Sequence, residues 1–324
     1  MALLKKGRLI HCGLLLVLVG AVLRWGWGQE GFLELRQGQA VSGFWVEDDL
    51  FVPLDFSLRL KKIGAEFYDA KKTIPKDYRA DIQIVKDGKV ETEAVARVNH
   101  PLKFAGCWFY QYGYDPVFPD QTLIQAVKDP GLGWVYAGYA LLLLGLAVFG
   151  RRIISLDLSR NKIIYSLVFV ALFCLAAMLI FSRRHRFLVP ALQSHWLIWH
   201  ILSCMSAYSL FALLFILSFK RRISSSGFYL RQNFLYAGMF LLILGIIMGS
   251  VWGKYAWGNW WNWDPKETWA LITVCIYAAY FHPRLWPGLS RERRLRWVAR
   301  LGFLSCIFTY FGVNFLLKGM HSYG

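Results

Sequence analysis

Apolar residues gather in seven long runs along the chain, and short polar or basic stretches separate most of these runs. A helix of about 20 mostly apolar residues is long enough to cross a bilayer, and each run comes close to that length. We therefore predict a polytopic α-helical membrane protein with about seven transmembrane helices, at residues 9–25, 131–150, 162–181, 196–219, 233–252, 267–283 and 298–317.

The segment between the first two runs, residues 28–129, follows a different period. Residues 80–85 read Ala-Asp-Ile-Gln-Ile-Val, the turn sequence Lys-Asp-Gly-Lys follows at 86–89, and a stretch rich in Val and Thr comes next. Alternation of apolar and polar residues on both sides of an Asp-Gly turn is typical of a β-hairpin. We therefore expect one β-rich extracytoplasmic domain between transmembrane helices 1 and 2.

The distribution of Lys and Arg predicts how the helices are oriented. Short loops at 5–8, 151–162, 220–231 and 284–300 carry 17 of these residues, whereas the short loops on the other side, at 183–186, 254–266 and 318, carry six. The basic side faces the cytoplasm in most membrane proteins, so we place the amino terminus inside and the carboxyl terminus outside the bacterial inner membrane. The first run resembles a secretory signal, but no small-x-small cleavage site follows it, and we expect it to be retained.

Composition agrees with a membrane protein and excludes several other classes. The chain is 56% hydrophobic with a mean hydropathy of +0.39, which is high for a soluble domain. The net charge of +17 lies in short clusters between apolar runs, so we expect no nucleic-acid partner. No two of the six cysteines form a CxxC pair, which argues against a zinc site, and without CxxCH the chain is not itself a c-type cytochrome.

A segment rich in tryptophan is the strongest sign of a binding site. Five tryptophans fall within residues 257–269, in and just after the predicted external loop 253–266. Asp264, Pro265 and Glu267 form a helix N-cap with a capping box, which explains the Asp-Pro-Lys-Glu sequence but leaves the tryptophans unexplained. An interfacial aromatic belt and a stacking platform for a flat aromatic ligand both fit the spacing.

The histidines fall into two layers. His11 opens the first run and His282 closes the sixth, both on the predicted cytoplasmic side. His200 lies about one turn into the fourth run from outside, and His321 follows the last run, also outside. A single membrane histidine is more often a packing residue, but two imidazole pairs fit a ligand that binds twice along a route. Neutral imidazole is a common axial ligand of haem iron.

These motifs resemble the haem-handling proteins of cytochrome c biogenesis system II. The sequence Trp-Asp-Pro-Lys-Glu-Thr-Trp-Ala at 263–270 is similar to the Trp-rich (WWD) signature of the CcsA (ResC) proteins, and the related CcmC and CcmF proteins of system I differ after the aspartate. Further matches to CcsA lie at 196–200, 311–314 and 319–324. The amino-terminal part resembles CcsB (ResB) at 8–14, 98–103, 109–111 and 128–131.

The resemblance covers most of the chain and implies a fused CcsBA-type synthase. It implies a CcsB/ResB-like region at 1–150 and a CcsA/ResC-like region at 151–324. By the same resemblance, His200 and His321 ligate haem iron at an external site, and His11 and His282 ligate it at an intramembrane site. The implied haem platform consists of Trp257, Trp260, Trp261, Trp263 and Asp264. His195 occupies a variable position beside the family histidine, and we expect neither it nor His100 nor His185 to bind iron.

The implied function is to carry haem b to the outer face and to attach its vinyl groups to the CxxCH cysteines of apocytochrome c, as a holocytochrome c synthase (haem lyase). Expected partners are apocytochrome c, thiol-reducing proteins and membrane lipid. CcsB proteins have further spans before the His11-type helix, so the chain is either a compact version or works with a further CcsB-like subunit. Two alternatives stay open: a haem exporter or chaperone that serves a separate ligase, and a non-haem transporter with an aromatic gate.

Overall fold

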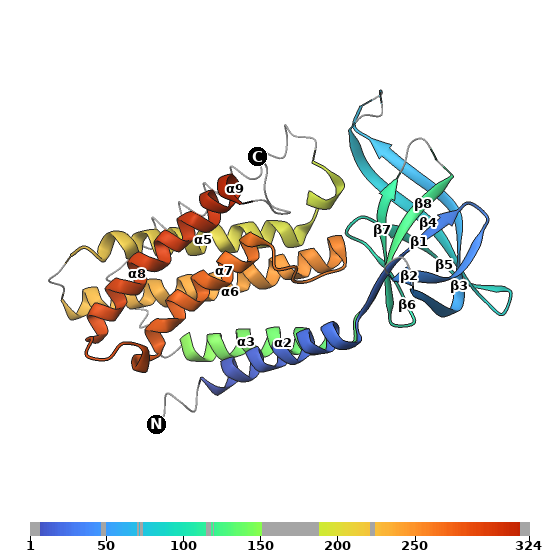
Figure 1. Ribbon diagram of the computed structural model, residues 1–324. Coiled ribbons are helices and arrows are strands. Elements are labelled where there is room, and N and C mark those ends of the chain that lie inside the picture. The colour runs from blue at the N-terminus through green and yellow to red at the C-terminus, as the bar shows by residue number, and fades with distance from the viewer. Residues whose placement is uncertain are drawn as a thin grey trace.

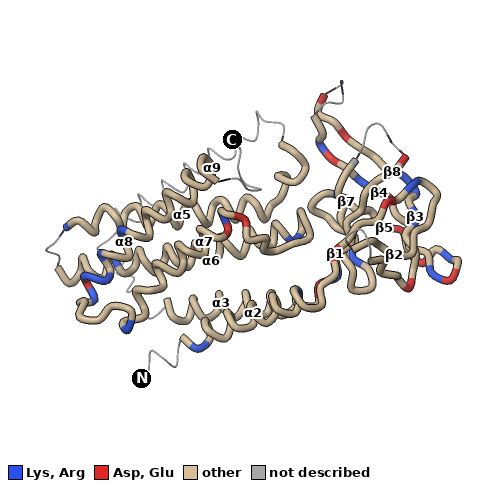
Figure 2. The backbone as a smooth tube through the Cα atoms, viewed as in Figure 1, with Lys and Arg blue, Asp and Glu red and all other residues tan. Residues whose placement is uncertain are grey.

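The computed structural model describes residues 7–46, 50–69, 71, 74–114, 118, 120–150, 188–220 and 224–317. The helices lie side by side in one elongated group, and a β domain sits at one end of that group (Figure 1). The described Lys and Arg residues of the helical part gather mainly at the opposite end, around the start of the amino-terminal helix and residues 284–300 (Figure 2). The two ends of the helices therefore differ in charge, as the loop composition predicts.

Eight antiparallel strands form the β domain within the described residues, in the order β5-β4-β3-β2-β1-β8-β7-β6. Outermost strands β5 and β6 also contact each other, so the sheet curls around a single apolar core that includes Leu35, Phe44 and Phe109. This confirms the predicted β-rich domain. The strands are β1 (Gln29–Arg36), β2 (Ala40–Val46), β3 (Leu50–Phe67), β4 (Pro75–Lys86), β5 (Lys89–Arg97), β6 (Leu102–Phe104), β7 (Cys107–Tyr114) and β8 (Gln121–Lys128).

The predicted hairpin is the turn between β4 and β5. Asp87 and Gly88 both have positive φ, 51° and 77°, as a type I′ turn requires. Ile82 and Ile84 are buried in the core at 1% and 0% exposure, whereas Gln83 between them donates a hydrogen bond to Glu93 on the neighbouring strand. The alternation that predicts the strand therefore also decides which side chains form the core.

Helices α2 (Arg8–Trp27) and α3 (Leu132–Gly150) pack against each other along glycines. A Cβ added to Gly138 would lie 2.8 Å from the Gly13 carbonyl oxygen, and one added to Gly131 would lie 2.0 Å from the Gly20 carbonyl oxygen. Real Cβ atoms do not approach backbone so closely, so only glycine allows the two backbones to meet here. Small residues at helix contacts serve the same purpose in membrane proteins generally.

The remaining helices form a second packed group. They are α5 (His195–Leu217), α6 (Ser225–Trp257), α7 (Pro265–Ala278), α8 (Arg291–Ile307) and α9 (Val313–Leu316), with the π-helical η4 (Phe308–Gly312) between the last two. At their centre the rings of Phe211 and Tyr277 stack with centroids 3.8 Å apart, and Gly302 leaves room for the Tyr277 ring. This group carries most of the candidate site.

Five of the described helical segments are long and apolar enough to cross a membrane: 8–27, 132–150, 195–217, 225–257 and 291–316. The chain is therefore a multi-pass membrane protein with a β domain. The predicted span 162–181 lies outside the described residues. The predicted span 267–283 corresponds to α7, which has 14 residues and continues into the 3₁₀ turn η2 (Ala279–Phe281), short of the roughly 20 residues that a full crossing takes.

Candidate functional site

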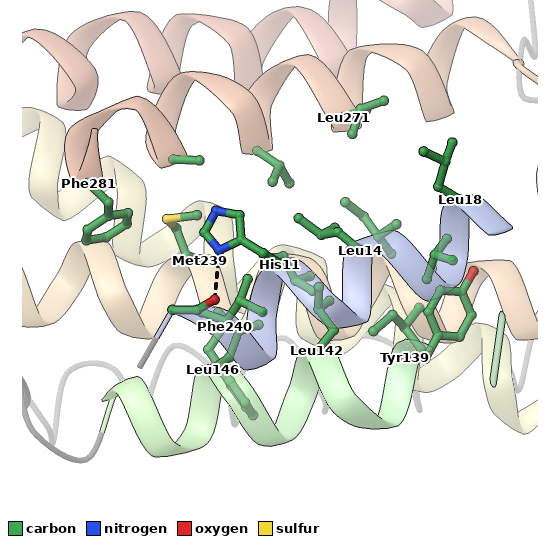
Figure 3. A pocket seen from close by; sticks show the side chains of 18 of the residues that line it. His11, Leu14, Leu18, Tyr139, Leu142, Leu146, Met239, Phe240, Leu271 and Phe281 are labelled. Carbon is green, nitrogen blue, oxygen red and sulfur yellow. Dashed lines mark hydrogen bonds between the residues drawn. The ribbon is translucent and has the colours of Figure 1, made fainter. Parts of the chain in front are cut away.

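A pocket of about 1760 Å³ runs between α2 and α3 on one side and α6 and α7 on the other. Its lining is mostly apolar, and Figure 3 shows Leu14 and Leu18 of α2 facing Leu271 of α7 across it. Pockets for drug-sized ligands typically measure about 300–1000 Å³, so this one has room for a larger molecule. Its lining extends from His11 and His282 to the tryptophan-rich segment.

His11 and His282 meet at the end of the pocket that lies away from the β domain, which we call the inner end. Their ring centroids are 6.3 Å apart and their planes are inclined at 79°. The pair was predicted from two segments more than 250 residues apart, and the structure brings them together. Their distance is close to the roughly 6 Å expected for two imidazoles on one metal ion, given metal–nitrogen bonds of about 2 Å each.

Hydrogen bonds fix the tautomer of both rings. Nδ1 of His11 lies 2.7 Å from the Gly7 carbonyl oxygen (Figure 3), and Nδ1 of His282 lies 3.0 Å from the Ala278 carbonyl oxygen. A carbonyl oxygen only accepts, so each Nδ1 must carry the proton, which leaves Nε2 with a lone pair. A hydrogen bond from the other ring nitrogen is how proteins usually orient a metal-binding histidine.

At the outer end, beside the β domain, three of the four predicted platform tryptophans line the pocket: Trp260, Trp261 and Trp263. Trp260 is buried and Trp263 is 70% exposed, and the rings of Trp261 and Trp263 meet edge to face with centroids 5.9 Å apart. Trp257 is not among the lining residues. It ends α6 and packs its ring against Trp252, with centroids 4.6 Å apart.

Asp264 has a structural role that the sequence predicts. Its side chain accepts a hydrogen bond from the Lys266 backbone N–H at 2.9 Å and, with Glu267, forms the capping box of α7. The Lys266 side chain in turn donates to the Asn314 side chain on α9 at 2.9 Å. Asp264 is buried and does not line the pocket, so it holds the start of α7 in place directly after the tryptophans.

His200 lies on the other side of α6 from the pocket. Its Nδ1 is 2.8 Å from the Gly245 carbonyl oxygen, and a Cβ on Gly249 would touch its ring. At 3.6 residues per turn, these two α6 positions point about 140° away from the α6 residues that line the pocket, such as Met239, Ile243 and Ile247. The predicted partner of His200, His321, lies outside the described residues.

A polar network at the outer end joins the β domain to the helices. Nη2 of Arg24 lies 2.6 Å from Glu30 and 3.0 Å from the Asn259 side chain, and Gln125 and Asn259 also donate to Glu30. The contact between Arg24 and Asn259 crosses 235 positions, and no local pattern predicts it.

Lys254 and Asp129 form a second, fully enclosed contact there. Their Nζ and Oδ2 atoms are 3.1 Å apart, and the side chains are 0% and 1% exposed. Nζ also donates to the Gly258 carbonyl oxygen at 3.0 Å, where the chain leaves α6 with a φ of +80°. The sequence analysis does not predict this pair. Two features could have indicated it: Asp129 lies in the CcsB-like segment 128–131, and Lys254 lies at the end of an apolar run.

Asn99, in the CcsB-like segment 98–103, has a structural role. Its side-chain amide donates to the Pro190 carbonyl oxygen at 2.9 Å, and it also contacts the Ala191 and Gln193 carbonyl oxygens. These bonds tie the β domain to the turn just before α5. His195 begins α5 and is exposed, and His100 sits in a backbone bridge with Arg97.

Family comparison agrees with both halves of this architecture. Residues 132–321, more than half of the chain, match the model of the cytochrome C assembly protein family. The chain belongs to this family. Residues 8–123 match the ResB-like family, so one chain carries both regions, as the sequence motifs indicate. Helix α2 lies in the ResB-like match and α3 in the assembly match, and the glycine contact between them joins the two regions.

Relatives described as cytochrome c biogenesis protein CcsA are similar to part of the chain. The protein from Chlamydomonas reinhardtii is 40% identical over 152 residues, which is 42% of this chain and 43% of the relative. Those from Guillardia theta and Prochlorococcus marinus (strain MIT 9312) are 40% and 39% identical over 171 and 175 residues, each covering 42% of this chain and 56% of the relative. The chain thus spans about half the length of these relatives.

Proposed function

We propose that this protein carries haem through the membrane-spanning helices and joins it to apocytochrome c at the outer end. The observation that carries the proposal is the pocket, which extends from the His11–His282 pair to the tryptophan-rich segment. Metal-binding chemistry at one end and aromatic stacking surfaces at the other are what a flat iron porphyrin needs along a single route.

The inner end fits haem iron as a first holding site. Both imidazoles have Nε2 as the acceptor nitrogen, and their separation suits one metal ion between them. A neutral imidazole on each face of the porphyrin gives six-coordinate, low-spin iron. The charged end of the helices would then face the cytoplasm, with the β domain and the tryptophan-rich segment outside the bacterial inner membrane.

At the outer end the protein would position haem while thiol and vinyl groups react. Each cysteine S–H of CxxCH adds across one vinyl C=C bond, forming a C–S bond and a C–H bond with no net redox change. The protein's part is orientation and exclusion of water. Trp260, Trp261 and Trp263 supply the stacking surface, and the β domain lies directly beside them through the network of Arg24 and Glu30.

One observation favours a second candidate, a haem exporter or chaperone that serves a separate ligase. His200 belongs to α5 and contacts Gly245 of α6 on the far side of that helix from the pocket. Among the described residues, therefore, a two-histidine site forms at the inner end alone. An exporter needs that site and the route, but forms no thioether bond.

The test is the visible spectrum of the full chain purified from haem-supplied cells. We expect a Soret band with low-spin, two-histidine character, which His11→Ala or His282→Ala diminishes and the matched control His195→Ala leaves unchanged. Incubation with apocytochrome c, haem and reductant should then give a covalent holocytochrome. A haem-free protein would refute both candidates, whereas bound haem without thioether formation would leave the exporter.

A further inference from the structure

Three arginines line the inner end of the pocket, beside the histidine pair. Arg284 follows His282 by two residues, and Arg291 and Arg294 lie three residues apart in the first turns of α8, on one face of that helix. Tyr280, two residues before His282, contacts two of them: its hydroxyl accepts a hydrogen bond from Nε of Arg291 at 3.1 Å, and its ring centroid lies 6.0 Å from Cζ of Arg294. We call these three residues the inner arginine cluster.

The inner arginine cluster has no salt-bridge partner within the described residues, although Glu292 lies next to Arg291 in the first turn of α8. The acidic side chain that lines the pocket, Glu30, lies at the outer end. Nε and Nη1 of Arg294 are buried without a hydrogen-bond partner. Buried N–H groups without a partner cost free energy, and the guanidinium of this half-buried arginine therefore favours an anion beside it.

The start of α8 contributes positive charge at this end of the pocket. Ser290 caps the beginning of α8, and its side chain accepts from the Arg293 backbone N–H. Helix N-termini carry a partial positive charge and favour acidic side chains; Glu292 is one such residue, but arginines occupy the neighbouring positions 291, 293 and 294. Three arginines against one glutamate leave the start of α8 with a net positive charge.

We infer that the inner arginine cluster is a carboxylate-binding subsite, which holds the two propionates of haem while His11 and His282 hold its iron. This inference rests on the proposed function and adds what the histidines cannot supply, namely orientation of the porphyrin in its plane. Guanidinium groups suit this task because they bind carboxylates through paired N–H groups. Lipid phosphates at the membrane surface are the competing anions for the same chemistry.

The test compares haemin with its dimethyl ester, in which both carboxylates are blocked and the iron is unchanged. Both are titrated into the full chain in detergent, in a His200→Ala, His321→Ala background that removes the predicted external ligands. We expect haemin to bind about tenfold tighter than the ester, or more, since hydrogen bonds to charged groups are strong. Arg284→Gln, Arg291→Gln, Arg294→Gln in combination should bring the two affinities together.

Arg293→Gln is the matched control, because Arg293 lies in the same helical turn but does not line the pocket. It should keep the preference for haemin, and a two-histidine spectrum with the ester shows that each variant is folded. Equal affinities in the unsubstituted arginine background would overturn the inference while leaving the proposed function intact. A preference that survives the triple substitution would also overturn it and assign the arginines to lipid headgroups. If neither haemin nor its ester gives a two-histidine spectrum, the proposed function itself is refuted.

Discussion

The two ends of the pocket differ in whether their basic side chains form ion pairs. At the inner end, Arg284, Arg291 and Arg294 line the cavity without a carboxylate partner among the described residues. At the outer end, Arg24 is paired with Glu30, and Lys254 is paired with Asp129 in full burial. The cations of the outer end are already satisfied by the protein, whereas those of the inner end remain available to a ligand.

This difference separates two tasks that one pocket has to combine. Paired charges at the outer end fasten the β domain and the tryptophan-rich segment to the helices, which gives a fixed surface. Unpaired charges at the inner end give an attractive potential for an anion. They can therefore distinguish a ligand with carboxylates from one without, which an apolar cavity cannot do. Substitutions at either end, or in the wall that the two ends share, should therefore have larger effects than substitutions elsewhere.

Breaking the buried outer pair should have the largest effect on stability. Lys254→Met leaves Asp129 enclosed without a counter-ion, so we expect the free energy of unfolding to fall by about 3–5 kcal/mol. Thermal unfolding in detergent measures the loss. Lys103→Met is the matched control, since Lys103 is exposed at the same junction, where it contacts Tyr255 and Trp108. A similar loss for both variants would mean that burial of the pair is not what matters.

Filling the glycine contact between α2 and α3 should come next and affect both ends together. Gly138→Ala puts a Cβ 2.7 Å from Cγ2 of Val17 and 2.8 Å from the Gly13 carbonyl oxygen, so we expect a loss of about 1–3 kcal/mol. Gly133→Ala in the same helix meets nothing within 4 Å and should be neutral or slightly stabilising. Equal unfolding temperatures for the two variants would refute the close contact.

Removing the negative charge at the outer end should make that end resemble the inner one. Glu30→Gln leaves the Arg24 guanidinium without its carboxylate, at a cost of roughly 1 kcal/mol for a partly buried pair. In the haemin and ester titration, protein with intact histidines should then favour haemin more strongly. Glu34→Gln, which breaks the exposed pair with Arg36, should change neither value. If Glu30→Gln behaves like Glu34→Gln, Glu30 does not neutralise the charge of Arg24.

The smallest effect is expected for an exposed pair within the β domain, remote from both ends. Hydrogen bonds from Lys61 and then from Gln83 lower the pKa of Glu93. Its contribution is therefore present above the ordinary glutamate pKa of 4.5 and is lost as the pH falls through the lowered value. Glu93→Gln should lower the unfolding temperature only slightly at pH 7. In acid, the difference in unfolding temperature between the variant and the unsubstituted protein should disappear. A difference that grows in acid would contradict this sign.

Local pattern was enough for part of the fold. Alternating residues and the Asp87-Gly88 turn predict the β4–β5 hairpin, because register and turn geometry are written in adjacent positions. The same approach ended the fifth predicted span at 252, whereas α6 continues to Trp257. Lys254 explains the difference: a charged residue normally marks the end of an apolar run, but here Asp129, 125 positions away, allows its burial.

The sequence predicts which residue types form the candidate site better than it predicts which of those residues line the same pocket. Position within the spans and the family resemblance were enough to pair His11 with His282, and the structure supports their proximity. The tryptophans, by contrast, look equivalent in sequence, yet Trp257 ends a helix while Trp260, Trp261 and Trp263 follow the turn at Gly258. Which ring faces a cavity depends on where one helix ends, and helix ends depend on distant contacts.

The glycine contact between α2 and α3 also determines where a ligand can come in. Where glycines let the two backbones touch, no side chain lies between them that could change its rotamer, so the two helices form one closely packed wall. The opposite flank, where Leu14 and Leu18 face Leu271, is built from exposed leucine side chains that rearrange easily. A hydrophobic ligand dissolved in the bilayer would therefore come in sideways, between α2 and α7, without having to pass through water.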